Sequence, residues 1–174
     1  MKKIIFILAA TLLSLNMSAQ EIYENQYKVK VGDMAPDFDL ELPTGKKVKL
    51  SSLKGKVVML QFTASWCGVC RKEMPHIEKE IWQKHKDNPN FALYGIDREE
   101  SAETVLKFAK TTNVTYPIGL DLDACIFGLY ADKSAGITRN IIIDKDGKIV
   151  MLTRLFKIEE FGEMVQVIDN LLNK

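Results

Sequence analysis

Cysteine and histidine are scarce in this chain, which contains three cysteines and two histidines among its 174 residues. A structural zinc site needs four ligands at suitable spacings. Outside the closely spaced pair Cys67 and Cys70, only Cys125, His76 and His85 could supply ligands, and none of these three is paired along the sequence. We therefore expect no metal and no other cofactor in this protein.

The sequence also lacks a long apolar run and a block of basic residues. Its most apolar stretch, Ile4 to Leu15, is shorter than the roughly 18–20 residues of a membrane-spanning helix. With a formal net charge of +1 and no basic cluster, the chain has nothing that favours nucleic-acid binding. Its 47% apolar and 27% charged residues fit a single globular domain with a short export segment.

The first nineteen residues have the three parts of a secretory signal peptide. Lys2 and Lys3 form the charged start, Ile4 to Leu15 is the apolar centre, and a short polar stretch ends in Ala19, where we expect cleavage. Cleavage leaves 22 basic and 23 acidic side chains, a formal charge of −1. We expect a periplasmic protein, and an uncleaved segment that anchors the chain to the membrane is the alternative.

After the signal peptide, residues 20–30 are expected to be a polar lead-in and residues 31–174 a single domain. Alternating apolar residues predict an N-terminal β-hairpin, and continuous apolar runs predict buried strands of a central sheet. Apolar residues at helical spacing predict four helices, the first with a kink at Pro75. The expected strands are 38–42, 48–50, 57–62, 91–96, 141–143 and 148–155, and the expected helices are 68–86, 101–110, 123–130 and 158–172. This order predicts an α/β fold with a mixed sheet.

The strongest chemical signal is the motif Cys67-Gly68-Val69-Cys70, where a buried strand leads directly into a helix. At a helix start, unpaired amide groups and the positive end of the helix dipole favour a thiolate, so the pKa of Cys67 should be lowered. Cys70 lies one helical turn further on, close enough to form a disulfide, and should be the more buried partner. Because so small a loop constrains the unfolded chain little, a redox role fits this pair better than a structural one.

Three stretches of the chain resemble the TlpA/ResA-like group of thioredoxin-family proteins, and the first is also similar to the opening of peroxiredoxins. They are Gly32-Asp33-Met34-Ala35-Pro36-Asp37-Phe38, then Leu53-Lys54-Gly55-Lys56-Val57-Val58 with Trp66-Cys67-Gly68-Val69-Cys70-Arg71-Lys72-Glu73-Met74-Pro75, and Ile143-Asp144-Lys145-Asp146-Gly147-Lys148-Ile149. The resemblance covers about residues 31–172. It implies a thioredoxin fold of the AhpC/TSA–thioredoxin-like superfamily, with a mixed β-sheet flanked by helices and an N-terminal hairpin extension.

The resemblance also implies roles for individual residues. Cys67 would be the attacking cysteine and Cys70 the resolving one, and Glu73 would occupy the position of an acidic residue that tunes the pair. The alternative for Glu73 is an ordinary solvated charge on the helix. The implied activity is reduction of disulfides in exported proteins, with a membrane thiol donor that returns electrons to the pair.

One departure concerns the segment expected to face the cysteines and to form, with Trp66, the substrate-binding surface. Thioredoxin-type proteins usually have a cis-proline there, whereas this chain has Thr138 within Ile137-Thr138-Arg139. This version is similar to peroxiredoxins, in which an arginine helps the reactive thiolate. Arg139 could do the same for Cys67 in a thiol peroxidase, or it could be an ordinary strand-edge arginine.

The peroxidase hypothesis has a weakness in the sequence itself. Peroxiredoxins place a threonine three residues before the reactive cysteine, whereas here that position is Ala64, and Thr63 is one residue too early. A third hypothesis is a non-enzymatic binding module, such as a chaperone or a metal carrier, in which the cysteines would be dispensable.

Four other side chains are expected to have secondary roles. Cys125 should be a buried structural thiol, with a further redox partner as the alternative. His76 and His85 should have surface or capping roles. Trp66 is expected to shield the cysteine pair from bulk water.

Overall fold

The computed structural model describes residues 26–173, so the expected signal peptide at residues 1–19 lies outside the described residues. Seven strands form one mixed sheet in the order β2-β1-β5-β4-β3-β6-β7. The strands are β1 (Asp39–Glu41), β2 (Lys47–Lys49), β3 (Val57–Thr63), β4 (Phe91–Arg98), β5 (Ile118–Asp121), β6 (Arg139–Ile143) and β7 (Ile149–Arg154). The central strand β3 pairs parallel with β4 and antiparallel with β6. The expected α/β fold with a mixed sheet is confirmed.

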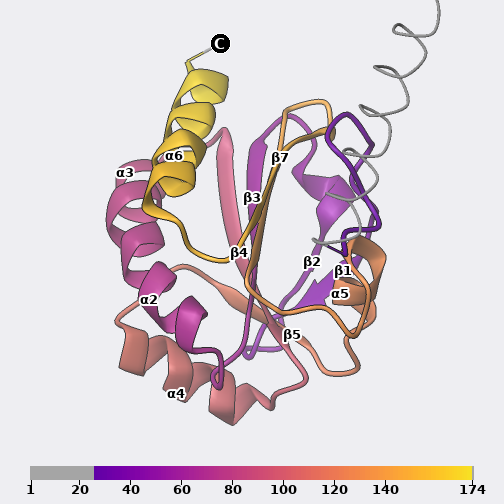
Figure 1. The fold of residues 1–174 in the computed structure, drawn as a ribbon, viewed down its shortest axis with the longest axis vertical. Helices are drawn as coiled ribbons and strands as arrows, with labels where there is room; N and C mark the ends of the chain where they lie inside the picture. Colours follow the sequence, from indigo (N-terminus) through magenta and orange to yellow (C-terminus); the bar gives the residue numbers. More distant parts are fainter. Residues whose placement is uncertain (1–25, 174) are drawn as a thin grey trace, which may run out of the picture.

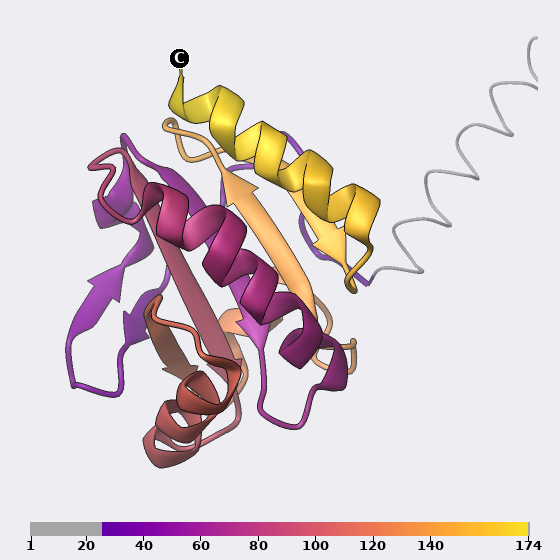
Figure 2. The ribbon, with the colours of Figure 1, turned by 90° about the vertical axis from the view of Figure 1, so that its left-hand side faces the viewer.

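Helices cover both faces of this sheet (Figure 1). The face that is turned toward the viewer in Figure 2 carries most of them, and the opposite face carries α5. On the first face lie α2 (Gly68–His76), the π-helical segment η2 (Ile77–Trp82), α3 (Gln83–His85), α4 (Ala102–Thr112) and α6 (Ile158–Leu172), and on the second lies α5 (Cys125–Tyr130). Because both faces are covered, all seven residues of β3 are buried, as its continuous apolar run predicts.

The expected N-terminal hairpin is present and extends the sheet. Strands β1 and β2 pair antiparallel, and the 3-10 helix η1 (Leu50–Leu53) follows them. Strand β1 also pairs with β5, which brings Leu40 against Gly119. A Cβ atom at Gly119 would overlap the Leu40 side chain, so glycine at this position permits the close approach of the two strands.

The helix predicted over residues 68–86 occurs as the consecutive segments α2, η2 and α3. Pro75 lacks the amide that would bond the carbonyl of Arg71, and the wider π-helical turns begin two residues later. The helix therefore accommodates its internal proline by a local change of winding.

Strand β5 is missing from the sequence-based interpretation. Its four residues are too few to show an alternating pattern, and all but Leu120 are buried, since β1 and β4 lie on either side of the strand. Among residues 26–173, no helix is long and apolar enough to span a bilayer.

Candidate active site

The cysteine pair lies where β3 leads into α2. Cys67 is the N-cap residue of α2, and its sulfur accepts a hydrogen bond from the backbone amide of Cys70 at 3.1 Å. The two cysteines form a disulfide with their Cα atoms 5.3 Å apart. Cys67 is 7% exposed and Cys70 is fully buried, so only the first sulfur is within reach of another molecule. An amide donor at a helix start stabilises negative charge on the Cys67 sulfur.

The segment before β6 places Thr138 against both sulfurs. The Thr138 hydroxyl lies 3.2 Å from the Cys67 sulfur and 3.3 Å from the Cys70 sulfur. Thr138 is 2% exposed, and the preceding Ile137 is buried as well. No peptide bond among residues 26–173 is cis. The position that usually holds a proline therefore brings a hydroxyl to the reacting atoms.

Glu73, one turn after Cys70, is 1% exposed, so its interpretation as a solvated helix charge is wrong. The Asn140 amide donates to one of its carboxylate oxygens at 2.7 Å, and the Gln61 amide donates to the other at 3.3 Å. Burial raises the pKa of Glu73 to about 7, against the lowering effect of these two hydrogen bonds. Glu73 can therefore exchange a proton near neutral pH.

The sequence interpretation did not include the two amide side chains that hold Glu73. Gln61 also accepts a hydrogen bond from the Tyr116 hydroxyl at 2.6 Å, and Asn140 donates to the Thr153 hydroxyl at 3.0 Å. The signal that could have found them is a polar side chain inside an apolar strand, because a buried amide needs partners. These residues form a buried polar network beneath α2.

A second buried carboxyl lies at the end of β4. Asp97 pairs with Thr63 in the parallel ladder, and within residues 26–173 neither of its carboxylate oxygens has a hydrogen-bond partner. Burial and the neighbouring Glu100 raise the pKa of Asp97 to about 8. Glu100 accepts hydrogen bonds of 2.5 Å from both the amide and the hydroxyl of Ser65. Glu100 thus anchors the loop that leads to Cys67.

Arg139 faces away from the cysteine pair. Neighbouring residues of a strand point to opposite faces, so Thr138 and Asn140 face α2 whereas Arg139 faces α5. Its guanidinium lies 4.2 Å over the Tyr27 ring and 5.9 Å from the Phe127 ring. Arg139 is fully buried, so it is not an ordinary strand-edge arginine, and within residues 26–173 its guanidinium contacts Tyr27, Phe127 and the Gly136 carbonyl, which gives no support to a role at Cys67.

Thr63, the threonine nearest to the position required by the peroxidase hypothesis, forms its hydrogen bond away from Cys67. The Thr63 hydroxyl donates to the Met74 sulfur at 3.5 Å, under α2. With Thr63 on Met74 and Arg139 on Tyr27, neither group of a peroxide site reaches Cys67. The structure therefore gives no support to a thiol peroxidase.

Apolar side chains face solvent beside the pair. Trp66, which precedes Cys67 in the chain, is 64% exposed, and its role as a shield of the cysteine pair stays a prediction. Leu155 is exposed too, and its amide donates to the Thr138 carbonyl at 3.2 Å, which places it next to the facing segment. Trp66 thus offers apolar surface next to Cys67 in the chain, and Leu155 offers it next to the segment that faces the pair.

Cys125 is exposed, so the expectation of a buried structural thiol is wrong. It is the first residue of α5, and its sulfur lies 3.0 Å from the Asp123 carboxylate and 3.9 Å from the Lys133 ammonium. The hydrogen bond to Asp123 raises the pKa of the Cys125 thiol. A thiol with a raised pKa is poorly suited to nucleophilic attack.

Both histidines pair with acidic side chains, the more exposed His76 with Glu80 and the partly buried His85 with Asp169. Over residues 26–173, no three histidine, cysteine, aspartate or glutamate side chains converge in a way that could hold a metal ion.

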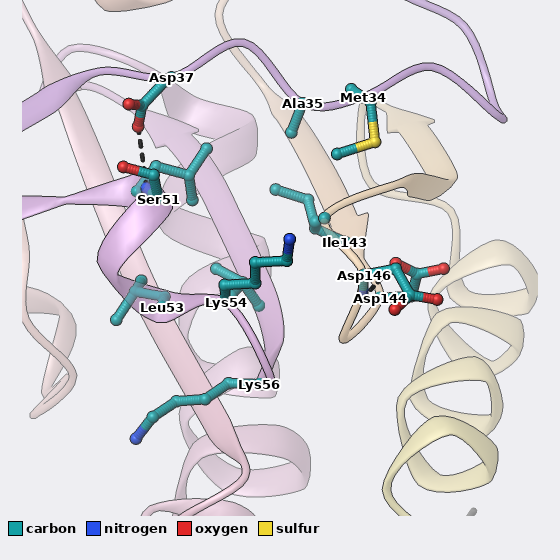
Figure 3. Close-up of a pocket in the computed structure, with 13 residues that line it drawn as sticks. Met34, Ala35, Asp37, Ser51, Leu53, Lys54, Lys56, Ile143, Asp144 and Asp146 are labelled. Carbon is teal, nitrogen blue, oxygen red and sulfur yellow. Dashed lines mark hydrogen bonds between the residues drawn. The ribbon is translucent and has the colours of Figure 1, made fainter.

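A cavity of about 230 Å³ lies at the opposite end of β3 from the cysteines. Figure 3 shows Met34 and Ile143 at this cavity, with Lys54 between the chain segments. At its edge the Asp37 carboxylate accepts a hydrogen bond from the Ser51 amide at 2.8 Å. The cavity and the cysteine pair are therefore separate features of the molecule.

Comparison with known proteins agrees with this geometry. Residues 31–152 match the model of the AhpC/TSA family. The thiol-disulfide oxidoreductase ResA of Bacillus cereus is 35% identical over 132 residues, which are 75% of this chain and 73% of the relative. ResA of Bacillus subtilis is 33% identical over 129 residues, 74% of this chain and 70% of the relative.

Solved structures give the same result. The solution structure of a candidate protein disulfide isomerase from Bacteroides thetaiotaomicron superposes with a TM-score of 0.84 at 65% identity, covering 86% of this chain and 94% of that one. The crystal structure of a candidate thiol:disulfide interchange protein DsbE from Chlorobium tepidum gives 0.73 at 29% identity, covering 83% and 99%. The shared features are the thioredoxin fold and the redox chemistry that these names describe.

Proposed function

The chain belongs to the AhpC/TSA family as one of its thiol–disulfide oxidoreductases, and from this premise we propose that it is exported and reduces disulfide bonds in other exported proteins. The observation that carries the proposal is the asymmetry of the cysteine pair. Cys67 retains a small exposed fraction, 7%, and its sulfur accepts a hydrogen bond from an amide, whereas Cys70 is fully buried. Such a pair can attack a foreign disulfide with one sulfur and resolve the product with the other.

The reaction proceeds by two exchange steps. The Cys67 thiolate attacks one sulfur of the substrate disulfide, and the other substrate sulfur leaves as a thiolate. The Cys70 thiolate then attacks the Cys67 sulfur, so that the substrate leaves with its second thiolate and the Cys67–Cys70 disulfide remains. Two electrons have passed to the substrate, and a membrane thiol donor returns two electrons to the pair.

Glu73 serves the second step as a proton acceptor. Cys70 must lose its proton before it can attack, and Glu73 lies one helical turn away with a pKa of about 7. An ordinary glutamate, with a pKa near 4.5, would be a much weaker base at neutral pH. The raised pKa therefore suits Glu73 to this transfer.

Substrate binding uses the surface around Cys67. Trp66 offers an exposed ring for apolar side chains that flank a substrate cysteine. The side chains of Ile137, Thr138 and Arg139 are buried. This segment therefore contacts a substrate through its backbone.

The proposal of export rests on residues 1–19, with their charged start, apolar centre and small residue at position 19. Expression of the full chain in a bacterial cell with a periplasm, followed by fractionation and N-terminal sequencing, tests it. A periplasmic protein that begins at Gln20 supports the proposal, and a cytoplasmic chain that retains Met1 overturns it.

Reduction of insulin disulfides tests the activity. The chain with a dithiol donor should precipitate insulin chains, Cys67→Ser should abolish the reaction, and Cys70→Ser should stop at a mixed disulfide. The matched control is Cys125→Ser, which removes the exposed third thiol and should react like the parent chain. Equal activity of all four proteins would refute the exchange mechanism, and a reduction potential as high as that of DsbA, about −120 mV, would refute the reducing direction.

A further inference from the structure

The hydroxyl of Thr138 has an unusual set of neighbours for a buried polar group. It lies within 3.3 Å of both reacting sulfurs, and within residues 26–173 it has no oxygen or nitrogen partner. Thr138 is almost completely buried, so bulk water does not satisfy the hydroxyl either. Its hydrogen-bonding capacity is therefore directed at the cysteine pair.

The strength of these contacts depends on the redox state of the pair. A sulfur in a disulfide is neutral and a weak acceptor, whereas a thiolate accepts a charge-assisted hydrogen bond that is roughly twice as strong as a neutral one. A buried hydroxyl without a good hydrogen-bond acceptor costs free energy, so it destabilises the redox state in which its only neighbours are weak acceptors. Thr138 is thus better satisfied in the reduced protein than in the disulfide form.

We propose that the Thr138 hydroxyl is a hydrogen-bond donor that serves the two sulfurs in turn, first the Cys67 thiolate of the reduced protein and then the Cys70 thiolate of the mixed disulfide. The proposal rests on the proposed function, because it concerns the two steps of the same exchange. In the reduced pair the hydroxyl donates to Cys67, together with the Cys70 amide, and accepts from the Cys70 thiol. Cys67 then has donors from two separate elements, α2 and the segment before β6.

In the second exchange step the Thr138 hydroxyl turns to Cys70, because the negative charge has moved to that sulfur. Once Cys67 is joined to a substrate its sulfur is neutral, and the Cys70 proton passes to the Glu73 carboxylate. The negative charge is then on Cys70, which is 3.3 Å from the same hydroxyl. Rotation about one side-chain bond transfers the donor to Cys70. As Cys70 attacks, its charge leaves with the substrate sulfur, and the hydroxyl again faces two neutral sulfurs.

Other charged groups near the pair remain in place when Thr138 is changed. Glu73 lies on the same helix as Cys70, Arg71 donates to the Ser65 carbonyl at 2.8 Å, and Glu100 holds Ser65 from the other side. Within the described chain, the hydrogen bonds of these three groups go to residues other than Thr138. A substitution at Thr138 therefore isolates the contribution of the hydroxyl.

The test compares Thr138→Val, which keeps the shape of the side chain and loses the hydroxyl, with Thr138→Ser, which keeps the hydroxyl. Both are made in the full chain with Cys125→Ser, so that Cys67 is the accessible thiol. The pKa of Cys67 is measured from the pH dependence of alkylation and from thiolate ultraviolet absorbance, and the potential by equilibration with glutathione. Thr138→Val should raise the pKa by about one unit and move the equilibrium about tenfold toward the disulfide, about 30 mV more negative.

Thr138→Ser should stay within a few tenths of a unit of the parent pKa. Equal pKa values and potentials for threonine, serine and valine at position 138 would overturn the proposal. Thr138→Ala, checked by circular dichroism, replaces the valine variant if valine prevents folding. These readouts need no protein substrate. A chain that fails to reduce insulin but still shows the valine shift disproves the proposed function alone, and the reverse result disproves the role of the hydroxyl alone.

Discussion

The surroundings of Glu73 and Asp97 differ, although both carboxyl groups are buried on the face of the sheet that carries α2. Glu73 receives hydrogen bonds from Asn140 and Gln61, and burial raises its pKa to about 7. Asp97 has no hydrogen-bond partner within residues 26–173, and burial next to Glu100 raises its pKa to about 8.

The difference lies in how each charge is compensated. Two amide donors keep the Glu73 pKa close to neutral, so that its protonated and ionised forms are both populated when the enzyme works. Asp97 lacks such donors, so it is mostly protonated at neutral pH and unsuited to accept a proton from a cysteine. Burial raises both pKa values, but the hydrogen bonds decide which carboxyl can take part in proton transfer.

The largest expected effect is on stability, from Asp97→Asn. The pKa of Asp97 is about 8 in the folded protein and 3.8 in the unfolded chain. The folded protein therefore holds the Asp97 proton more tightly, and its free energy of unfolding falls as the pH rises through about 8. Asparagine cannot ionise, so the variant does not lose stability in this way. It should be more stable than the parent by about 3 kcal/mol at pH 9, with a smaller gain at pH 5. Urea unfolding at both pH values measures this. Asp87→Asn, at an exposed aspartate, is the control, and an equal gain at both pH values would show that Asp97 is not a buried acid.

Asn140 is the closer of the two hydrogen-bond donors to Glu73, and its removal should lower the stability of the protein rather than raise it. Asn140→Ala should lower stability by about 2 kcal/mol, and by more at pH 8 than at pH 5, because the lost bond is stronger to an ionised carboxylate. A double-mutant cycle with Glu73→Gln separates this bond from the other contacts of Asn140. A coupling energy near zero at pH 8 would mean that Asn140 does not stabilise the Glu73 charge.

Glu73→Gln distinguishes the two carboxyls by activity. The rate of insulin reduction should fall roughly tenfold at neutral pH, and the pH profile should lose the group that titrates near 7, because glutamine cannot accept a proton. Steady-state rates between pH 5 and 9 measure both. Glu103→Gln, at an exposed glutamate of α4, should behave like the parent. Asp97→Asn should retain the pH profile of the parent. If Asp97→Asn instead loses the group that titrates near 7, Asp97 and not Glu73 is the proton acceptor.

The smallest expected effect comes from Tyr116→Phe, which removes the hydroxyl that donates to Gln61 at 2.6 Å. Stability should fall by about 1 kcal/mol, since the buried Gln61 oxygen loses its partner. The less restrained amide should also bond Glu73 less well and raise the midpoint of the pH profile by a few tenths of a unit. An unchanged midpoint would limit the role of Gln61 to packing.

Much of the fold could be predicted because its elements have local patterns. The apolar run of β3, the hairpin and the helix at Ile158–Leu172 are all where periodicity predicts them. Strand β5 could not be found in this way, since its burial depends on β1 and β4, which are distant in sequence. Pro75 predicts an irregularity in the helix that contains it, but not that this irregularity takes the form of π-helical turns.

The candidate site was predictable where its geometry is local. Cys67 and Cys70 follow from the junction of a strand and a helix, whereas Gln61 and Asn140 become partners of Glu73 only when β3 and β6 pair. Strand alternation could have shown that Thr138 and Arg139 cannot both face the cysteines. Cys125 is exposed because it starts α5, whose buried side chains are those of Ile126, Phe127 and Tyr130.

The contact between Cys67 and Thr138 joins residues 71 positions apart, and Thr138 directly precedes β6, which pairs with β3. Contacts of such sequence separation require closure of a long loop and therefore form late in folding. The disulfide itself spans three positions and can close in an unfolded chain. The two cysteines can therefore be cross-linked before the chain folds, whereas the donors that stabilise the Cys67 thiolate, the Cys70 amide in α2 and the Thr138 hydroxyl, are in place only in the folded protein.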